Sequence, residues 1–185
     1  EGSETNEFNR TLGQVGVDAR YPFIRSDGNV TWILEPRVQV TQNFGDAKLD
    51  QFTTLDSNGF TVDLAQDGTD IDLDQALFWQ SNKAAGYDLW EDGLRADVGA
   101  SVSANWKDNR AQLFFGQSYT TDTNTEFDAS SGLRDDNSDL VGLFELDLGQ
   151  RFSSQTRVRF DEDLAHGVIQ AEDFGHRDWI QVHVK

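Results

Sequence analysis

The chain has 185 residues, with 33 acidic and 15 basic side chains and a formal charge of −18. Such an acidic chain repels a phosphate backbone, which excludes nucleic acid as its main partner. No apolar run approaches the ~18 residues of a membrane-spanning helix, and the absence of cysteine excludes disulfide bonds. We expect one partial domain over residues 1–185, a piece of a longer protein, because the sequence starts without Met and stops within a strand pattern.

Two alternating stretches open the chain, at residues 11–24 and 30–44. In the second, apolar residues such as Trp32 and Val38 occupy every other position, and polar residues such as Gln39 occupy the rest. Successive side chains of a strand point to opposite faces, so both stretches are predicted to be strands with one apolar face.

The connection between these strands contains Asp27 and Gly28, a pair that tolerates the backbone of a tight hairpin. Pro36 interrupts the second strand, and its nitrogen cannot donate a hydrogen bond. We therefore expect a bulge or a locally broken pairing at Pro36.

Long polar loops are predicted at about residues 45–86 and 122–138, which are rich in Asp, Thr, Ser and Gly. Within the first loop, residues 60–64 fit a short strand, and residues 74–85 fit a helical turn or two that ends at Gly86.

An acidic run in the first loop, DGTDIDLD, raises the question of a calcium site, because hard cations bind clustered carboxylates. The run lacks the spacing of an EF-hand, so a solvated loop is the favoured interpretation and no metal or other cofactor is predicted. The weak metal candidates are Asp67, Asp70, Asp72 and Asp74.

Residues 94–106 alternate without a break and exceed the ~5–6 residues of an ordinary strand. Their length is nearer the ~9–11 residues of a strand that crosses a bilayer at a tilt. Further strands are predicted at residues 111–121, 139–152, 155–163, 168–174 and 179–185. The chain is therefore predicted to be all-β, an antiparallel up-and-down meander of about eight strands and part of a large transmembrane barrel.

Charges on the polar parity suggest which face would meet lipid, because a charged side chain costs a few kcal/mol on a lipid face. In a membrane, the charged parity must line the lumen and the apolar parity must face lipid. A soluble antiparallel sheet with one wet face has the same period, and that alternative stays open. The predicted lumen-facing residues are Glu35, Arg37, Arg95, Asp97, Glu145, Arg157 and Arg159, and the predicted lipid-facing residues are Leu94, Val98, Val102 and Phe144.

No motif supports an enzyme. His166, His176 and His183 have no metal-ligand spacing, and the chain contains no nucleophile elbow, P-loop or dinucleotide fingerprint. We therefore predict a protein without catalytic residues.

Four strings occur in a fixed order: LEPRVQV at residues 34–40, GYDLWEDGLR at 86–95, FGQSY at 115–119 and SGLRDDNSDLVG at 131–142. Together they resemble the C-terminal barrel domain of the LptD family of lipopolysaccharide-assembly proteins, also called organic-solvent-tolerance proteins. GHRDWIQVHV at residues 175–184 resembles a later hairpin of that family more loosely.

This resemblance implies an outer-membrane β-barrel of a Gram-negative bacterium that delivers lipopolysaccharide to the outer leaflet. It also implies contact with outer-membrane lipid and with a plug lipoprotein of the LptE type. The chain shows neither the periplasmic jelly-roll of the family nor recognisable first or last barrel strands, so we expect a middle portion without the lateral gate. The alternatives are a soluble or surface β-rich binding module, with or without calcium, and another porin-like barrel.

Overall fold

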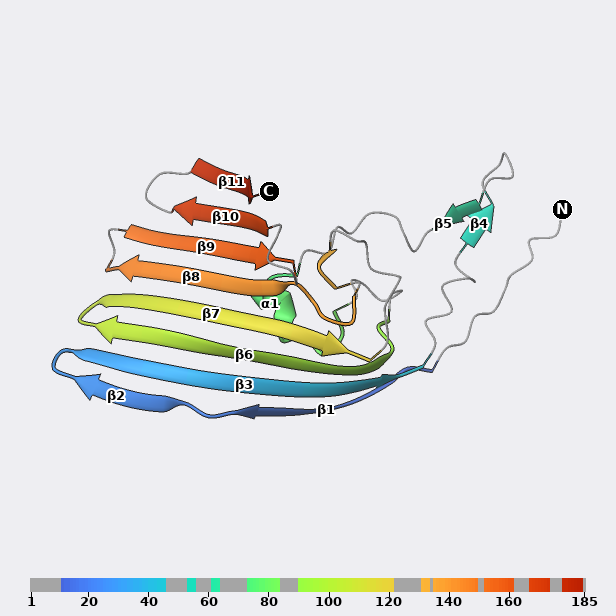
Figure 1. Cartoon of the computed structure of the whole chain (residues 1–185), viewed down its shortest axis with the longest axis horizontal. Coiled ribbons are helices and arrows are strands. Elements are labelled where there is room, and N and C mark those ends of the chain that lie inside the picture. The colour runs from blue at the N-terminus through green and yellow to red at the C-terminus, as the bar shows by residue number, and fades with distance from the viewer. Residues whose placement is uncertain are drawn as a thin grey trace.

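The computed structural model describes residues 11–45, 53–55, 61–63, 73–83, 90–121, 131–133, 135–149, 152–161, 167–173 and 178–184. Within these ranges the chain forms a large antiparallel sheet, a small two-stranded sheet and one short helix (Figure 1). In chain order the elements are β1 (Gly13–Arg20), β2 (Phe23–Asp27), β3 (Val30–Phe44), β4 (Thr53–Leu55), β5 (Thr61–Asp63), α1 (Gln75–Phe78), β6 (Gly93–Trp106), β7 (Asn109–Thr120), β8 (Leu140–Leu148), β9 (Phe152–Phe160), β10 (Gly167–Asp173) and β11 (Asp178–Val184).

The large sheet has nine strands in the order β1-β3-β6-β7-β8-β9-β10-β11, with β2 also paired to β3. Every pairing is antiparallel, and neighbours in this sheet follow one another along the chain once the β4–β5 pair and α1 are set aside. The prediction of an all-β antiparallel meander is confirmed. Among the described strands the sheet is open, with β1 and β2 at one edge and β11 at the other.

The hairpins follow the turn residues of the sequence. Asp27 pairs with Val30, so Gly28 and Asn29 form a two-residue turn in which Gly28 has φ of +57°. β3 begins and ends at the predicted residues and pairs with β6 along its length, from Val30 opposite Trp106 to Asn43 opposite Gly93.

The interruption expected at Pro36 lies on one side of β3 only. Pro36 keeps its place opposite Ala100 in the ladder with β6. On the other side, the ladder stops at Arg20 and resumes at Phe23. Residues 21–22 face residues 35–36 in this gap, so the register is unchanged and no bulge forms. Two prolines, Pro22 and Pro36, fall in the same gap, and neither can donate to the ladder.

Other boundaries also differ from the sequence prediction. The single strand predicted at residues 11–24 is divided into β1 and β2, and β2 extends to Asp27. The helix ends at Phe78 rather than near residue 85, because Trp79 leaves the helical conformation with φ of −95° and ψ of 10°. The turn after β8 comes earlier than predicted, because Gly149 adopts φ of +60° and ends the strand at Leu148. The short strand predicted at residues 60–64 is present as β5, paired with β4.

The short turns and the long loops leave opposite ends of the strands (Figure 1). Two-residue turns join β2 to β3 and β6 to β7, and a short turn joins β8 to β9. The connections from β3 to β6 and from β7 to β8 both start at the other end of the strands, and α1 lies against the sheet beside β7 and β8 (Figure 1). We call these the short-turn end and the long-loop end.

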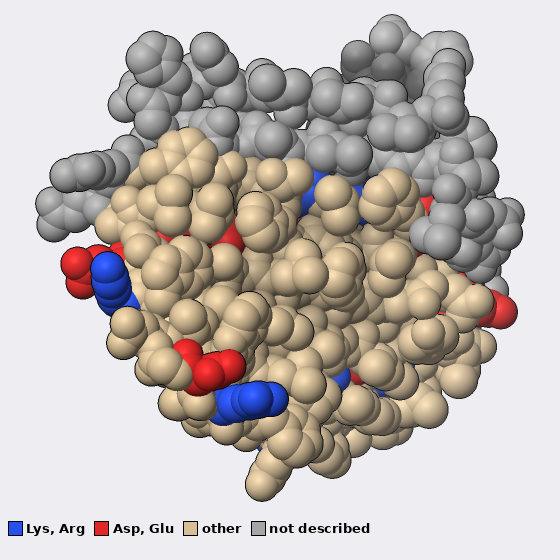
Figure 2. Space-filling model, turned by 60° about the vertical axis from the view of Figure 1, so that its left-hand side comes forward, with Lys and Arg blue, Asp and Glu red and all other residues tan. Residues whose placement is uncertain are grey.

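The two faces of the large sheet differ in composition and in what covers them. One face, called the apolar face below, carries exposed side chains such as Val17, Trp32, Val98 and Phe144. The opposite face, called the polar face, carries Thr41, Arg95, Asp97 and Ser118, which are all buried. Charged side chains occupy only small patches of the surface shown in Figure 2. No helix in the described part of the chain is long and apolar enough to cross a membrane.

Candidate functional site: the polar face and its strap

Residues 73–83 return from the long-loop end and lie on the polar face of the sheet. We call them the strap. The first part of the strap contains α1, and Asp74 caps its N-terminus. Oδ1 of Asp74 accepts a hydrogen bond from the Leu77 amide at 2.9 Å. A single helical turn is unstable alone, so its position depends on what the strap contacts.

Two glycines on the sheet make room for the strap. Gly99 on β6 and Gly116 on β7 are directly opposite one another. A Cβ atom at Gly116 would lie 2.5 Å from Cζ of Phe78, and one at Gly99 would lie 3.0 Å from Cζ2 of Trp79. The two aromatic rings therefore occupy a notch of bare backbone that any larger residue would fill.

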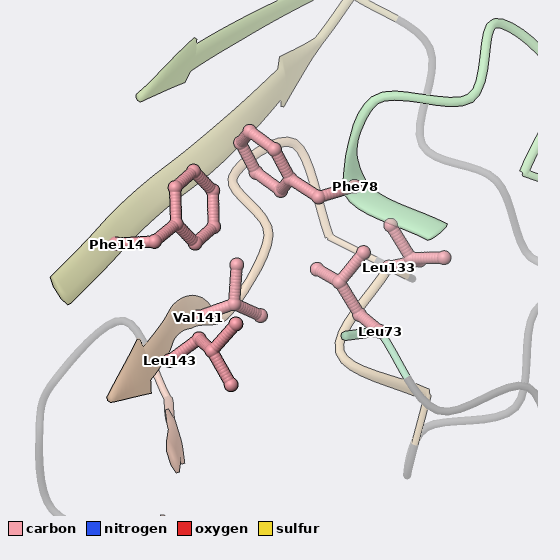
Figure 3. Close-up of a cluster of buried hydrophobic side chains, with 6 residues drawn as sticks. All are labelled: Leu73, Phe78, Phe114, Leu133, Val141 and Leu143. Atoms are coloured by element: carbon pink, nitrogen blue, oxygen red, sulfur yellow. The ribbon is translucent and has the colours of Figure 1, made fainter. Parts of the chain in front are cut away.

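A hydrophobic cluster surrounds this notch (Figure 3). Phe78 is fully buried, and its ring meets the ring of Phe114 edge-on, with centroids 5.5 Å apart. Leu73 from the strap and Leu133 from the second long loop complete the cover over Val141 and Leu143. The compact hydrophobic core therefore lies on the polar face, where residues of the long loops meet the sheet.

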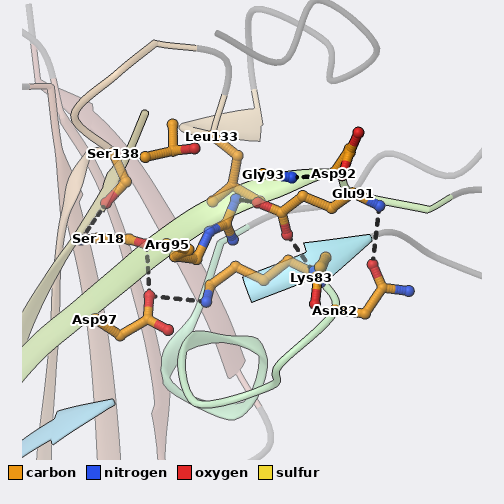
Figure 4. Close-up of polar contacts among 12 residues, drawn as sticks. Asn82, Lys83, Glu91, Asp92, Gly93, Arg95, Asp97, Ser118, Leu133 and Ser138 are labelled. Carbon is orange, nitrogen blue, oxygen red and sulfur yellow. Dashed lines mark hydrogen bonds and ion pairs between the residues drawn. The ribbon is translucent and has the colours of Figure 1, made fainter. Parts of the chain in front are cut away.

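Beside the cluster lies a buried network of charges (Figure 4). Nζ of Lys83 is 2.9 Å from Oδ1 of Asp97, and both side chains have no exposed surface. Ser118 donates its hydroxyl to the same oxygen of Asp97. Arg95 pairs with Glu91, which also accepts a hydrogen bond from the Lys83 amide. Two positive and two negative side chains thus give the network no net charge.

Several atoms at the centre of this network have no hydrogen-bond partner. They are Oε1 of Gln39, Oγ1 of Thr41, Nε and Nη1 of Arg95 and Oδ2 of Asp97. β3 and β6 place these side chains together, because Gln39 is opposite Asp97 and Thr41 is opposite Arg95. Burial lowers the pKa of Lys83 to about 8; Arg95 acts in the same direction and Asp97 opposes it.

Ser81, near the C-terminal end of the strap, contacts β1, which lies at one edge of the described sheet. The Ser81 hydroxyl donates to Oε1 of Gln14 at 2.8 Å, Gln14 donates to Oδ1 of Asn43 at 2.7 Å, and Asn43 donates to the Ser81 carbonyl at 3.2 Å. These bonds form a closed ring that joins the strap, β1 and β3. The guanidinium of Arg37 lies 4.3 Å above the ring of Trp79.

All seven predicted lumen-facing residues lie on the polar face, as the strand registers show. Arg95 and Asp97 form the buried network, and Arg37 contacts Trp79 and Asp18, so these three lie against the strap or beside it. The other four are not part of that network: Glu35 is half-buried on β3, Glu145 accepts a hydrogen bond from Gln155, Arg157 donates to Gln155, and Arg159 pairs with Asp139.

The four predicted lipid-facing residues share the apolar face and are exposed, Leu94 by 38%, Val98 by 44%, Val102 by 38% and Phe144 by 41%. Of the weak metal candidates, Asp74 caps α1, and Asp67, Asp70 and Asp72 lie outside the described residues. The described ranges contain no group of three or more His, Cys, Asp or Glu side chains that could hold a metal ion.

Sequence reasoning missed the strap residues Phe78 and Lys83 and the notch glycines. A signal was present on the polar parity of β7, where Phe114 and Gly116 interrupt a run of polar residues. On β8, Val141 and Leu143 break the polar parity in the same way. Apolar residues and glycine on the wet parity of neighbouring strands indicate that something packs there.

Comparison with known proteins identifies the family. The profile of the LptD family, LPS transport system D, matches residues 1–167, which include the four strings noted in the sequence but not the looser one at residues 175–184. No curated protein and no solved structure matches the chain. Because the match covers most of the chain, the protein belongs to the LptD family, a family of outer-membrane proteins that transport lipopolysaccharide.

Proposed function

We propose that this chain forms part of the wall of an outer-membrane barrel that delivers lipopolysaccharide to the outer leaflet of a Gram-negative bacterium. In this proposal the apolar face meets membrane lipid and the polar face lines the lumen. The chain carries no catalytic group in this function, because moving a lipid between compartments changes no covalent bond.

The observation that carries this proposal is the inverted burial of the sheet. A soluble antiparallel sheet packs its apolar face on a core and leaves its polar face in water. Here the exposed large apolar side chains include Val17, Leu34 and Phe115, and the buried side chains include charged Lys83, Arg95 and Asp97. A contiguous apolar surface of this kind requires a nonpolar environment, and lipid supplies one.

The polar face suits a hydrated lumen and a protein plug. Beyond the strap, its side chains are half-buried and hydrogen-bonded, as in the row from Glu145 through Gln155 to Arg157. We propose that a plug lipoprotein of the LptE type, the partner implied by the family resemblance, contacts this part of the polar face toward the short-turn end. The strap covers the polar face toward the long-loop end, so a plug has less surface to contact there.

Adjacent residues on β6 provide a matched test in the full-length protein. Val102 lies on the apolar face and Ser101 on the polar face, opposite Glu35. An arginine on a lipid face costs ~2–4 kcal/mol at the middle of the bilayer, so V102R should reduce the amount of assembled barrel and of surface lipopolysaccharide severalfold. S101R should leave both near the unsubstituted level, because the new charge lies beside Glu35.

The measurement is made in cells whose only copy of the protein carries the substitution. Assembled protein is counted in the outer-membrane fraction, and lipopolysaccharide is counted at the cell surface. A soluble module that packs its apolar face on a core would also be sensitive to V102R, but its unsubstituted form would be recovered in the soluble fraction and not in the outer membrane. A porin-like barrel would lose assembly with V102R, but surface lipopolysaccharide would stay unchanged.

A further inference from the structure

The strap contacts five neighbouring strands through three kinds of contact: hydrogen bonds, an ion pair and apolar packing. Ser81 bonds to Gln14 on β1 and Asn43 on β3. Lys83 pairs with Asp97 on β6, and Phe78 packs on Gly116 of β7 and Val141 of β8. These strands are consecutive in the sheet.

We propose that the strap is an internal tie that makes these five strands, β1, β3, β6, β7 and β8, move as one rigid unit. The proposal goes beyond lipopolysaccharide delivery, because it concerns how the wall is held together and is tested without transport. It assigns a mechanical role to residues 73–83, which connect β1 to the rest of the described sheet in addition to the ladder between β1 and β3.

β1 depends on this second connection for a physical reason. The ladder of β3 with β1 and β2 is interrupted between Arg20 and Phe23, where Pro22 and Pro36 cannot donate and the Tyr21 amide donates to the Pro36 carbonyl at 3.2 Å; β1 is paired with β3 from Gly13 to Arg20. Its side chains are exposed on both faces. The ring of hydrogen bonds through Gln14, Asn43 and Ser81 fixes β1 near its N-terminal end, and the ion pair between Asp18 and Arg37 fixes it near the gap.

Phe78 is the anchor of the strap, because it is its largest fully buried side chain and fills the notch at Gly116. If the strap moves as one unit, loss of the Phe78 packing on β7 and β8 also breaks the hydrogen bond of Ser81 to β1, which lies three strands away from β7 on the same face. If each contact acts alone, loss of Phe78 affects only β7, β8 and the strap itself. The two possibilities give different results in one experiment.

The experiment measures hydrogen–deuterium exchange of the full-length protein in lipid nanodiscs, with peptides that cover the strap, β1 and β9. S81A removes one hydroxyl and should speed exchange in β1 by about fivefold, with β9 unchanged. F78A should speed exchange of the strap amides on the order of a hundredfold and reproduce the fivefold effect in β1. The control is Q80A, an exposed strap residue, which should change neither.

Unchanged β1 exchange in F78A together with faster strap exchange would overturn the proposal, because the contacts would then be independent. Unchanged β1 exchange in S81A would also overturn it. Should F78A fail to assemble, F78L takes its place, since leucine removes less packing from the notch, and the same comparison of β1 exchange with strap exchange decides the question. Failure of the proposed lipopolysaccharide function would leave each of these results unaffected.

Discussion

The two faces of β6 show how one strand meets two environments. On one side, Leu94, Val98 and Val102 are well exposed, although each is apolar. On the other side, Arg95 and Asp97 have almost no exposed surface, although each is charged. Adjacent residues therefore show the reverse of the burial that their chemistry prefers in water.

The comparison shows that the pattern which forms a strand does not by itself tell whether that strand lies in water or in lipid. Alternation alone is shared by membrane and soluble sheets, so it specifies a strand and not a solvent. The position of the strap indicates which face of the sheet is covered by protein. Among the described residues, the strap packs on the polar face, whereas in a soluble sheet the covering segment would be expected on the apolar face.

The largest expected effect comes from breaking the buried pair beneath the strap. D97A leaves Lys83 without its partner in a site with no exposed surface, which should lower the free energy of unfolding by about 3–5 kcal/mol. D147A is the control on the same face, where a half-buried carboxylate accepts a hydrogen bond from Ser153, and it should cost about 1 kcal/mol. Chemical unfolding in lipid vesicles measures both, and equal losses would show that the covered and uncovered parts of the polar face do not differ.

The next effect concerns the notch. G116A places a methyl group 2.5 Å from Cζ of Phe78 and should destabilise the protein by about 1–3 kcal/mol. G13A adds a methyl group whose closest neighbour is 3.9 Å away on Phe44, and it should change stability by less than about 0.5 kcal/mol.

A smaller side chain at position 78 tests whether Phe78 and Gly116 occupy the same space. Replacing Phe78 by leucine should cost less stability in the G116A background than in the unsubstituted protein, because the two changes share one space. Additive losses from the two changes would show that Gly116 does not serve as the seat of Phe78.

The smallest effect is a pH dependence from Lys83. Its pKa is lowered to about 8 in the docked strap, against an ordinary value of ~10.4 in water. Between these values the released lysine holds its proton more tightly than the docked one, so raising the pH favours the docked state by about 1 kcal/mol per pH unit at most. The stability of the unsubstituted protein relative to K83M should therefore rise from pH 8 to pH 10, and a fall would contradict the burial of Lys83.

Much of the sheet is predictable from the sequence because strand alternation is local. β3 has its predicted bounds, and the two-residue turn at Gly28 and Asn29 lies within the predicted connection. Errors occurred where a backbone conformation decides the boundary, as at Gly149, whose positive φ ends β8 before the predicted residue.

The site is only partly predictable, because it joins residues that are distant in sequence. Alternation identifies the parity of Arg95 and Asp97, but their burial depends on a strap whose helix is only four residues long. Phe78 and Gly116 meet through tertiary contact, and no local pattern in residues 73–83 specifies that partner. The cue that sequence reading offers is indirect, namely that Phe114 and Leu143 are apolar on a polar parity.

The most direct test of the account is a scan of β6 with a fluorophore attached to single cysteines in the full-length protein, placed in bilayers that contain a lipid-bound quencher. Labels at Leu94, Val98 and Val102 should be quenched, and labels at Ser101 and Ser103 should not, which gives a signal of period two. Uniform quenching, no quenching or the opposite parity would contradict the claim that the apolar face of this sheet meets lipid.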